Sequence, residues 1–230
     1  RQIANDKIRP VAAKYDETEE FAWDIVKTLV ASDLFGIYIP EAYGGMGAGV
    51  MEMCIVAEEL SKACGGIALG FAGTALGTFP ILLYGSEEQK KKYLTKIAKG
   101  TVAAFCITEA EAGSDAGSIR TTAKKDGDHY ILNGTKQWIT NAGEADVYTV
   151  IAMTDKAKGA RGASCFIVEK GMKGVEFGAK EKKLGIRASA TREVILTDCR
   201  VHKDNLISKE GMGFIIAMKV PTIKSSTGRC

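Results

Sequence analysis

The chain has 230 residues, of which 46% are hydrophobic and 26% charged, and this balance excludes a disordered protein. Its formal net charge of +3 is too small for a nucleic-acid-binding surface, and no cluster of basic residues is interleaved with aromatic ones. No uninterrupted apolar stretch approaches the roughly 20 residues of a membrane-spanning helix, so we expect neither a membrane segment nor a membrane partner.

The first part of the chain has the apolar spacing of helices. One helix is predicted after the acidic residues Asp16–Glu20, which suit the positive end of the helix dipole, and Gly36 is its expected stop. Its apolar face is Ala22, Ile25, Val26, Leu29 and Val30. A second helix is expected after a glycine-rich loop at 43–49. Its apolar stripe is Met53, Val56, Ala57, Leu60 and Cys64.

Two further helices are predicted before residue 100. Residues 67–83 are rich in small side chains, which suits a buried helix packed closely against its neighbours. Ser86 and Gln89 form a capping-box pattern after Gly85, so a helix is expected to begin there and to end before Gly100. These segments together predict an N-terminal α-helical bundle.

Beyond residue 100 the apolar period changes to two, which indicates strands. The expected strands are Val102–Ile107, Arg120–Lys124, Tyr130–Trp138, Tyr148–Met153, Ser164–Val168, Val175–Phe177 and Glu193–Leu196. Turn signals separate them, and Asn133-Gly134 is interpreted as a hairpin turn. Evenly spaced strands without long helices between them predict an antiparallel sandwich or barrel. A helical run resumes at 213–220 and is expected to stop at Pro221.

The fold class is therefore α+β, with an N-terminal α-helical bundle followed by an antiparallel β-sandwich or barrel domain and the start of a helical domain. The expected domains cover residues 1–100, 101–207 and 208–230. Short basic runs at Lys90–Lys92 and Lys180–Lys183 indicate solvated faces, with contact to an anionic ligand as the alternative.

The six cysteines are scattered, without a Cys-x-x-Cys pair or a histidine at metal-ligand spacing. Most lie in apolar runs, where a free thiol packs as a small hydrophobic group. This pattern indicates a reducing compartment, such as a bacterial cytoplasm or a mitochondrial matrix, and no disulfide framework. His129 and His202 are far apart in the sequence, so no metal site is expected.

Two segments carry residues suited to ligand binding. Residues 105–118, FCITEAEAGSDAGS, run from a strand into a glycine- and serine-rich turn that can surround an anion, although a plain turn explains the same residues. Residues 132–143, LNGTKQWITNAG, place Trp138, Ile139 and Thr140 near the end of a strand. A large aromatic side chain followed by a hydroxyl can flank a planar ligand, and a core tryptophan beside a β-favouring threonine is the alternative.

In this order the two segments resemble the acyl-CoA dehydrogenase family of flavoproteins, which typically carry a T-E-x-x-A-G-S-D turn and an N-G-x-K-x-W-I-T-N strand. The resemblance covers essentially the whole chain and includes Ile39–Glu41, Tyr84–Lys90 and Lys183–Arg187. It implies a helical domain, a β-domain and then a third, helical domain, at whose threshold this sequence stops at Cys230.

The resemblance implies FAD as the cofactor and places its contacts. Thr108 would hydrogen-bond the pyrimidine edge of the isoalloxazine, Thr140 would lie near flavin N5, and Ser114 would contact a cofactor phosphate or the pantetheine arm of an acyl-CoA. The implied cofactor-binding residues are Phe105, Cys106, Ile107, Thr108, Gly113, Ser114, Trp138, Ile139 and Thr140.

The resemblance also implies a reaction, the FAD-dependent α,β-dehydrogenation of an acyl-CoA to the trans-2-enoyl-CoA in fatty acid β-oxidation. The implied partners are an electron-transferring flavoprotein and further copies of the chain, in a tetramer or dimer. The catalytic glutamate is expected beyond Cys230, because Glu109 and Glu111 match turn residues. The chain alone is therefore expected to hold flavin poorly and to have little activity.

The acyl-chain length is suggested by residues 71–79, which match a wall of the family's acyl pocket. Phe71 and Phe79 could close that pocket to short or medium chains, and close helix packing is the alternative explanation of the small residues between them. Two other functions stay open at this point: a non-catalytic flavin- or CoA-binding fragment of such an enzyme, and an acyl-CoA oxidase.

Overall fold

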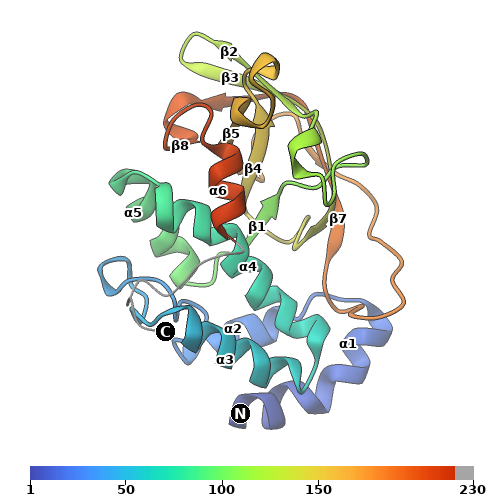
Figure 1. Ribbon diagram of the computed structural model, residues 1–230. Coiled ribbons are helices and arrows are strands. Elements are labelled where there is room, and N and C mark those ends of the chain that lie inside the picture. Colours follow the sequence, from blue (N-terminus) through green and yellow to red (C-terminus); the bar gives the residue numbers. More distant parts are fainter. Residues whose placement is uncertain (221–230) are drawn as a thin grey trace.

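The computed structural model describes residues 1–220 and places most of the helices at one end and a sheet at the other (Figure 1). The helices are α1 (Ala12–Thr18), α2 (Trp23–Ala31), α3 (Val50–Ser61), α4 (Gly65–Tyr84), α5 (Glu87–Ala98) and α6 (Gly213–Lys219). The strands are β1 (Ala103–Cys106), β2 (Thr122–Asp126), β3 (His129–Thr140), β4 (Val147–Met153), β5 (Ala163–Glu169), β6 (Val175–Phe177), β7 (Thr191–His202) and β8 (Leu206–Ile207). The α+β class, with helices before strands, is confirmed. Pro221 and Cys230, on which the expected stop and the expected third domain depend, lie outside the described residues.

The helix boundaries follow local capping. The Ser86 hydroxyl accepts a hydrogen bond from the Gln89 backbone N–H at 3.2 Å, and the Gln89 side chain accepts one from the Ser86 N–H at 3.0 Å, so the predicted capping box is present. The expected stop at Gly36 is wrong, because α2 ends at Ala31. Gly36 instead permits close packing, since a Cβ there would lie 3.0 Å from Ala98 Cα.

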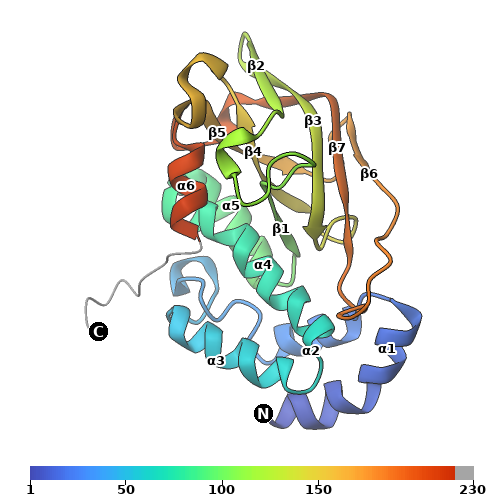
Figure 2. The same ribbon diagram turned by 45° about the vertical axis from the view of Figure 1, so that its right-hand side comes forward.

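Helix α4 runs between the other helices and the sheet (Figure 2). By length and composition it could cross a membrane, with a mean hydropathy of 1.7 in its apolar window, and the sequence expectation overlooked it. Glycines and threonines interrupt its apolar residues. The Thr74 and Thr78 hydroxyls nevertheless have hydrogen-bond partners, because each donates to a backbone carbonyl one turn earlier in the helix. Because 72% of the window is buried inside the protein, α4 is packed as a central core helix.

The strands form one eight-stranded sheet in the order β6-β7-β3-β2-β4-β5-β8, with β1 paired to β4. The pairing is mainly antiparallel, as expected, but β1 lies parallel to β4. The hairpin turn between β2 and β3 is at Gly127-Asp128, because Asp126 pairs with His129. The hairpin turn expected at Asn133-Gly134 is therefore wrong. Gly134 has a φ of 148° in β3, opposite a register shift at which β7 carries the extra residue, and a Cβ on Gly134 would lie 2.5 Å from Thr121 Oγ1.

Close approach of α4 to β1 joins the helices to the sheet. A Cβ on Gly77 would lie 2.6 Å from the Ala104 backbone nitrogen, so only glycine fits there. The Thr149 hydroxyl on β4 donates to the Gly77 carbonyl at 3.1 Å. These contacts at Gly77 hold one face of α4 against β1 and β4. Another face of α4 lies beside the ends of the strands.

Candidate functional site

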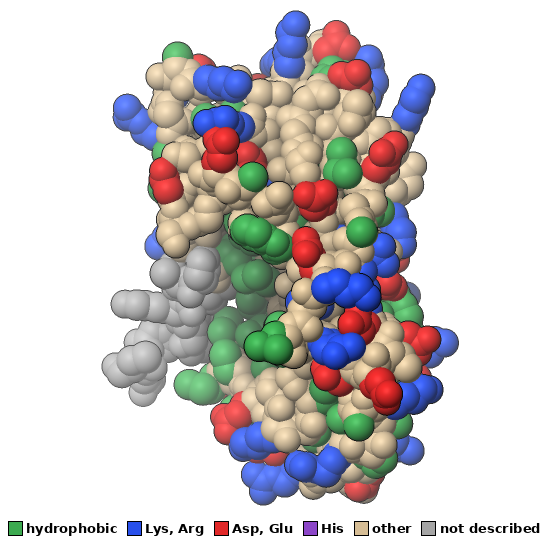
Figure 3. Space-filling model, turned by 90° about the vertical axis from the view of Figure 1, so that its right-hand side faces the viewer, with side chains coloured by type: hydrophobic (Ala, Val, Ile, Leu, Met, Phe, Trp, Pro, Cys, Tyr) green, Lys and Arg blue, Asp and Glu red, His purple; other side chains and the backbone are tan. Residues whose placement is uncertain are grey.

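A pocket of about 420 Å³ lies between α4 and the C-terminal ends of β1 and β3. Its lining residues are Leu69, Ala72, Gly73, Leu76, Phe105, Ile107, Thr108, Trp138, Ile139 and Thr140. The α4 residues recur three and four positions apart, so they form one face of the helix. The molecular surface drawn in Figure 3 is hollowed between the helices and the sheet, and hydrophobic side chains gather in that hollow.

The pocket brings together Phe105, Ile107 and Thr108 with Trp138, Ile139 and Thr140, which are far apart in the sequence. Cys106 is buried and does not line the pocket, and burial raises its pKa to about 12. Gly113 and Ser114 lie exposed in the turn beyond β1 and do not line the pocket either. The structure therefore gathers the residues of the two strand ends but not those of the turn.

Trp138 has a backbone conformation that is rare for a bulky residue, with a φ of 54°. It lies where the register of β3 against β7 shifts between Lys136 and Ile139, so an extra residue bulges from the strand. Its side chain is 58% exposed, which rules out the interpretation of Trp138 as a core residue. The bulged residue Trp138 is one of the residues that line the pocket.

Thr108 and Thr140 contribute hydroxyls to the same pocket. Neither side chain has a hydrogen-bond partner within residues 1–220, so both hydroxyls are available to a ligand. Gly73 lets Thr140 approach α4, because a Cβ on Gly73 would lie 2.8 Å from Thr140 Cγ2. An apolar pocket with two free hydroxyls suits a planar ring that has polar edges.

Asn141, directly after Thr140, anchors this end of β3. Its side chain is fully buried, and Nδ2 donates to the Gly70 carbonyl at 3.2 Å, the Thr74 hydroxyl at 3.3 Å and the Ala103 carbonyl at 3.1 Å. Its φ of 66° is in the left-handed region that asparagine tolerates. One side chain thus connects β3, α4 and β1 beside the pocket.

Glu109 and Lys136 form a buried ion pair, with 2.6 Å between Lys136 Nζ and Glu109 Oε1. The Lys136 ammonium also donates to the Ile107 carbonyl at 3.1 Å. Glu109 accepts further hydrogen bonds from the Thr121 hydroxyl and from the backbone N–H groups of Thr121 and Arg120. Burial acts to raise the pKa of Glu109, but Lys136 and these hydrogen bonds outweigh it and hold the pKa below its usual range. Both carboxylate oxygens of Glu109 therefore have partners within the protein.

Replacing Glu109→Gln is expected to lower the free energy of unfolding by about 2 kcal/mol at pH 7, because hydrogen bonds to a charged group are lost. The folded-state pKa of Glu109 lies below its unfolded value near 4.3, so its contribution is complete above that value and is lost as the pH falls through the folded-state pKa. Urea unfolding from pH 7 to pH 3 should show the two proteins converging in acid. A difference that does not change with pH would contradict the ionised pair.

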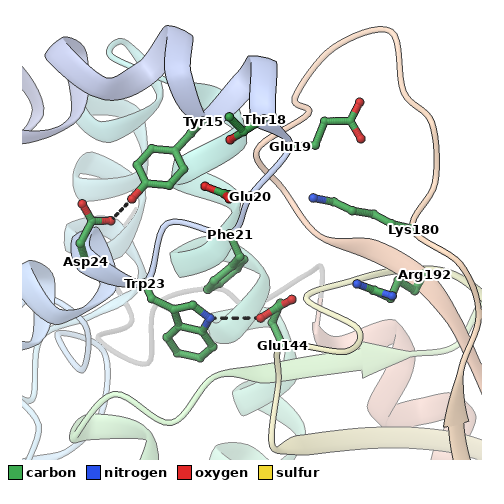
Figure 4. Close-up of a pocket in the computed structure, with 10 residues that line it drawn as sticks. All are labelled: Tyr15, Thr18, Glu19, Glu20, Phe21, Trp23, Asp24, Glu144, Lys180 and Arg192. Carbon is green, nitrogen blue, oxygen red and sulfur yellow. Dashed lines mark hydrogen bonds between the residues drawn. The ribbon is translucent and has the colours of Figure 1, made fainter.

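A second pocket, of about 480 Å³, lies between the segment joining α1 to α2 and the strands (Figure 4). Charged and aromatic side chains line it, and two of its carboxylates accept hydrogen bonds from aromatic neighbours. Trp23 Nε1 donates to Glu144 at 3.1 Å, and the Tyr15 hydroxyl donates to Asp24 at 2.5 Å. Lys180 of the second basic run lines this pocket (Figure 4). These groups make it a polar junction, which suits an apolar ring less well than the pocket beside α4.

The segment 71–79 that the sequence prediction placed on a pocket wall contains Ala72, Gly73 and Leu76, which do line the pocket, whereas Leu69 lies outside that segment. Phe71 and Phe79, which were expected to close the pocket, are buried in the helical core at 1% and 5% exposure. Because α4 is apolar on nearly all sides, its hydrophobic period does not show which face is open. Glycines at the sheet-facing positions were the available signal.

These residues fit the flavin that the resemblance implies. The two unpartnered hydroxyls face a pocket whose other walls are aliphatic or aromatic. Within residues 1–220 no charged side chain lines it, so a neutral ring meets no uncompensated charge. The donor set thus matches a tricyclic ring with hydrogen-bonding edges.

Comparison with known proteins supports the same family. The chain is 47% identical over 222 residues to "Acyl-CoA dehydrogenase, short-chain specific" of Clostridium acetobutylicum. This alignment covers 95% of this chain and 58% of that protein. The butyryl-CoA dehydrogenase structure from Megasphaera elsdenii superposes with a TM-score of 0.91 at 39% identity, over 95% of this chain and 59% of that one. The structure of an acyl-CoA dehydrogenase from Bacillus anthracis complexed with FAD has a TM-score of 0.88 at 40% identity, over 95% of this chain and 38% of that one.

The chain spans less than two thirds of the length of these relatives. Residues 1–101 match the acyl-CoA dehydrogenase N-terminal domain, and residues 104–199 match the middle domain of the same family. On the fold, the pocket and these matches, the chain belongs to the acyl-CoA dehydrogenase family.

Proposed function

We propose that the protein takes part in the FAD-dependent α,β-dehydrogenation of an acyl-CoA thioester to the trans-2-enoyl-CoA. The observation that carries this proposal is the placement of the free Thr108 and Thr140 hydroxyls on one apolar pocket. FAD, when bound there, supplies the two-electron acceptor that amino-acid side chains lack.

In this proposal, the residues of the chain bind and orient the flavin and shield it from water. Thr108 and Thr140 would donate hydrogen bonds to the ring edge, and such preformed donors stabilise negative charge without reorganisation. Trp138 and Phe105 line the pocket and would shield the ring from water with aromatic surface. Ser114 and Gly113, in the exposed turn, are proposed to contact the phosphates or the pantetheine arm.

The base that removes the α-proton is not among the pocket residues within 1–220, because none of them is a carboxylate. Glu109 is held in its ion pair with Lys136, and Glu111 is exposed and paired with Arg120. A general base has to reach the proton it abstracts, which neither side chain does here. We place the catalytic glutamate outside residues 1–220.

We propose a substrate of short to medium acyl length. The names of the Clostridium and Megasphaera relatives, short-chain specific and butyryl-CoA dehydrogenase, support this length. We further propose an electron-transferring flavoprotein as electron acceptor, a homo-oligomer as the active form, and a bacterial cytoplasm or mitochondrial matrix as its location.

Visible absorbance of the full-length purified protein tests this proposal. We expect a flavin spectrum that bleaches under anaerobic conditions with butyryl-CoA or octanoyl-CoA, and much less with palmitoyl-CoA. A protein that neither retains nor binds added FAD would overturn the proposal.

Two other outcomes decide between the proposal and its alternatives. A yellow protein that no acyl-CoA bleaches would identify a binding function without catalysis. Rapid reoxidation by oxygen, with formation of peroxide, would identify an acyl-CoA oxidase instead of a dehydrogenase. The lack of a pocket carboxylate within the described residues is what keeps the binding function as the second candidate.

A further inference from the structure

A single ammonium group joins the two strand ends that form the pocket. Lys136 has no exposed side-chain surface, although lysine is among the residues least often buried. Its Nζ lies 2.6 Å from Glu109 Oε1 and 3.1 Å from the Ile107 carbonyl oxygen. The bond therefore runs from β3 to the segment that follows β1.

The groups that Lys136 holds are direct neighbours of pocket residues. Ile107, whose carbonyl accepts the bond, is itself a lining residue and precedes Thr108. On the other strand, the backbone N–H of Gln137 donates to the Thr108 carbonyl at 2.9 Å. Trp138, with its left-handed backbone, follows immediately. Lys136 thus fixes the spacing between Thr108 and the bulge that presents Trp138.

A contribution to stability does not by itself explain why Glu109 and Lys136 form a buried ion pair. Replacing a buried ion pair by apolar side chains of similar volume is often neutral or stabilising, because both charges must be desolvated. An apolar pair at positions 109 and 136, however, would have no donor for the Ile107 carbonyl or acceptor for the Thr121 and Arg120 N–H groups. The pair therefore does what an apolar contact cannot: it sets where two strand ends lie.

We propose that Lys136, with Glu109 as its counter-ion, is a positioning residue that holds Thr108 and Trp138 at the spacing the ring requires. This inference rests on the proposed function for the identity of the ring. A bulged strand with a left-handed tryptophan stores strain that its surroundings must hold in place, and Lys136 is the buried side chain two positions before it.

The test compares Lys136→Met, Glu109→Gln and the double variant in the full-length protein. Each single variant leaves one buried charge unpaired and is expected to lose stability. The double variant removes both charges, so much of the stability should return, but the bond to the Ile107 carbonyl stays absent. We expect it to bind FAD about tenfold more weakly than the unchanged protein, the equivalent of one hydrogen bond to a charged group, with an altered visible flavin spectrum.

The matched control pair is Lys92→Met with Glu169→Gln, which removes another lysine–glutamate pair with a separation of 2.8 Å. Neither residue lines the pocket, so FAD affinity and spectrum should match those of the unchanged protein. Equal affinity and an unchanged spectrum in the Lys136→Met, Glu109→Gln protein would overturn the positioning role.

A flavin-independent measurement separates this inference from the proposed function. The chain has two tryptophans, so Trp23→Phe leaves Trp138 as the sole indole. In that background, acrylamide quenching of Trp138 fluorescence is expected to change in the Lys136→Met, Glu109→Gln protein and not in the control pair. If the unchanged protein binds no FAD, the proposed function fails and the quenching result still decides the inference. Unchanged quenching would refute it.

Discussion

Replacing Asn141→Asp is expected to lower the free energy of unfolding by about 4 kcal/mol at pH 7, although the side chains have nearly the same shape. Asn141 Nδ2 faces three acceptors: the Gly70 carbonyl, the Thr74 hydroxyl and the Ala103 carbonyl. A carboxylate there has no proton to donate and carries a buried, unpaired charge. Thermal unfolding should show a midpoint lower by about 12 °C.

The pH dependence identifies the cause. Burial among acceptors raises the folded-state pKa of the new carboxyl above its unfolded value near 3.9. The electrostatic penalty is therefore complete above the folded-state pKa and disappears as the pH falls toward 3.9. Asn5→Asp, at an exposed position, is the control and should change stability by less than about 0.5 kcal/mol. Equal stability of the Asn141→Asp protein and the unchanged protein at pH 7 would refute the anchoring role of Asn141.

Replacing Gly77→Ala is expected to cost about 3 kcal/mol, although alanine normally favours a helix over glycine by about 1 kcal/mol. The added methyl would lie 2.6 Å from the Ala104 nitrogen and 2.7 Å from its carbonyl carbon, and both are backbone atoms that cannot rotate away. Helix α4 would have to move from β1 and lengthen the bond from Thr149 to the Gly77 carbonyl. Urea denaturation measures the loss.

Gly65→Ala is the matched control in the same helix. The nearest atom to a Cβ at position 65 is Ile186 Cγ2 at 3.7 Å, which is ordinary van der Waals contact. This variant should be as stable as the unchanged protein or slightly more stable, because alanine restricts the unfolded chain. If both variants were stabilising, the close packing of α4 on β1 would be wrong.

The sequence predicted those parts of the fold that short-range patterns determine. The Ser86–Gln89 capping box and the small-residue run of α4 each depend on residues near one another in the chain. Asn133-Gly134 misled the prediction, because glycine with a positive φ also occurs inside a strand beside a register shift, and not only in a hairpin turn. The pairing of β3 with β2 and β7 keeps Gly134 inside a strand, and these partners lie too far along the chain for a local pattern to show it.

The candidate site shows the same division. The strand segments around Thr108 and Trp138 carry recognisable motifs, whereas the ion pair of Glu109 and Lys136 joins residues 27 positions apart. One signal did exist, because Leu132 and Lys136 alternate onto the same inward face of β3. For the open face of α4 the hydrophobic period gave no signal, since residues on every side of that helix are apolar, and only the glycines at its sheet-facing positions indicated its orientation.

Helix α4 both forms part of the core and lines the pocket, and this combination constrains how the pocket could evolve. Most of the helix is committed to the core, where Gly73 and Gly77 touch strands and tolerate no side chain. Among the residues of α4 that line the pocket, Leu69, Ala72 and Leu76 can vary without disturbing that core. Changes of ligand preference along a lineage should therefore concentrate at this narrow strip, spaced by single helical turns, while its glycine neighbours remain fixed.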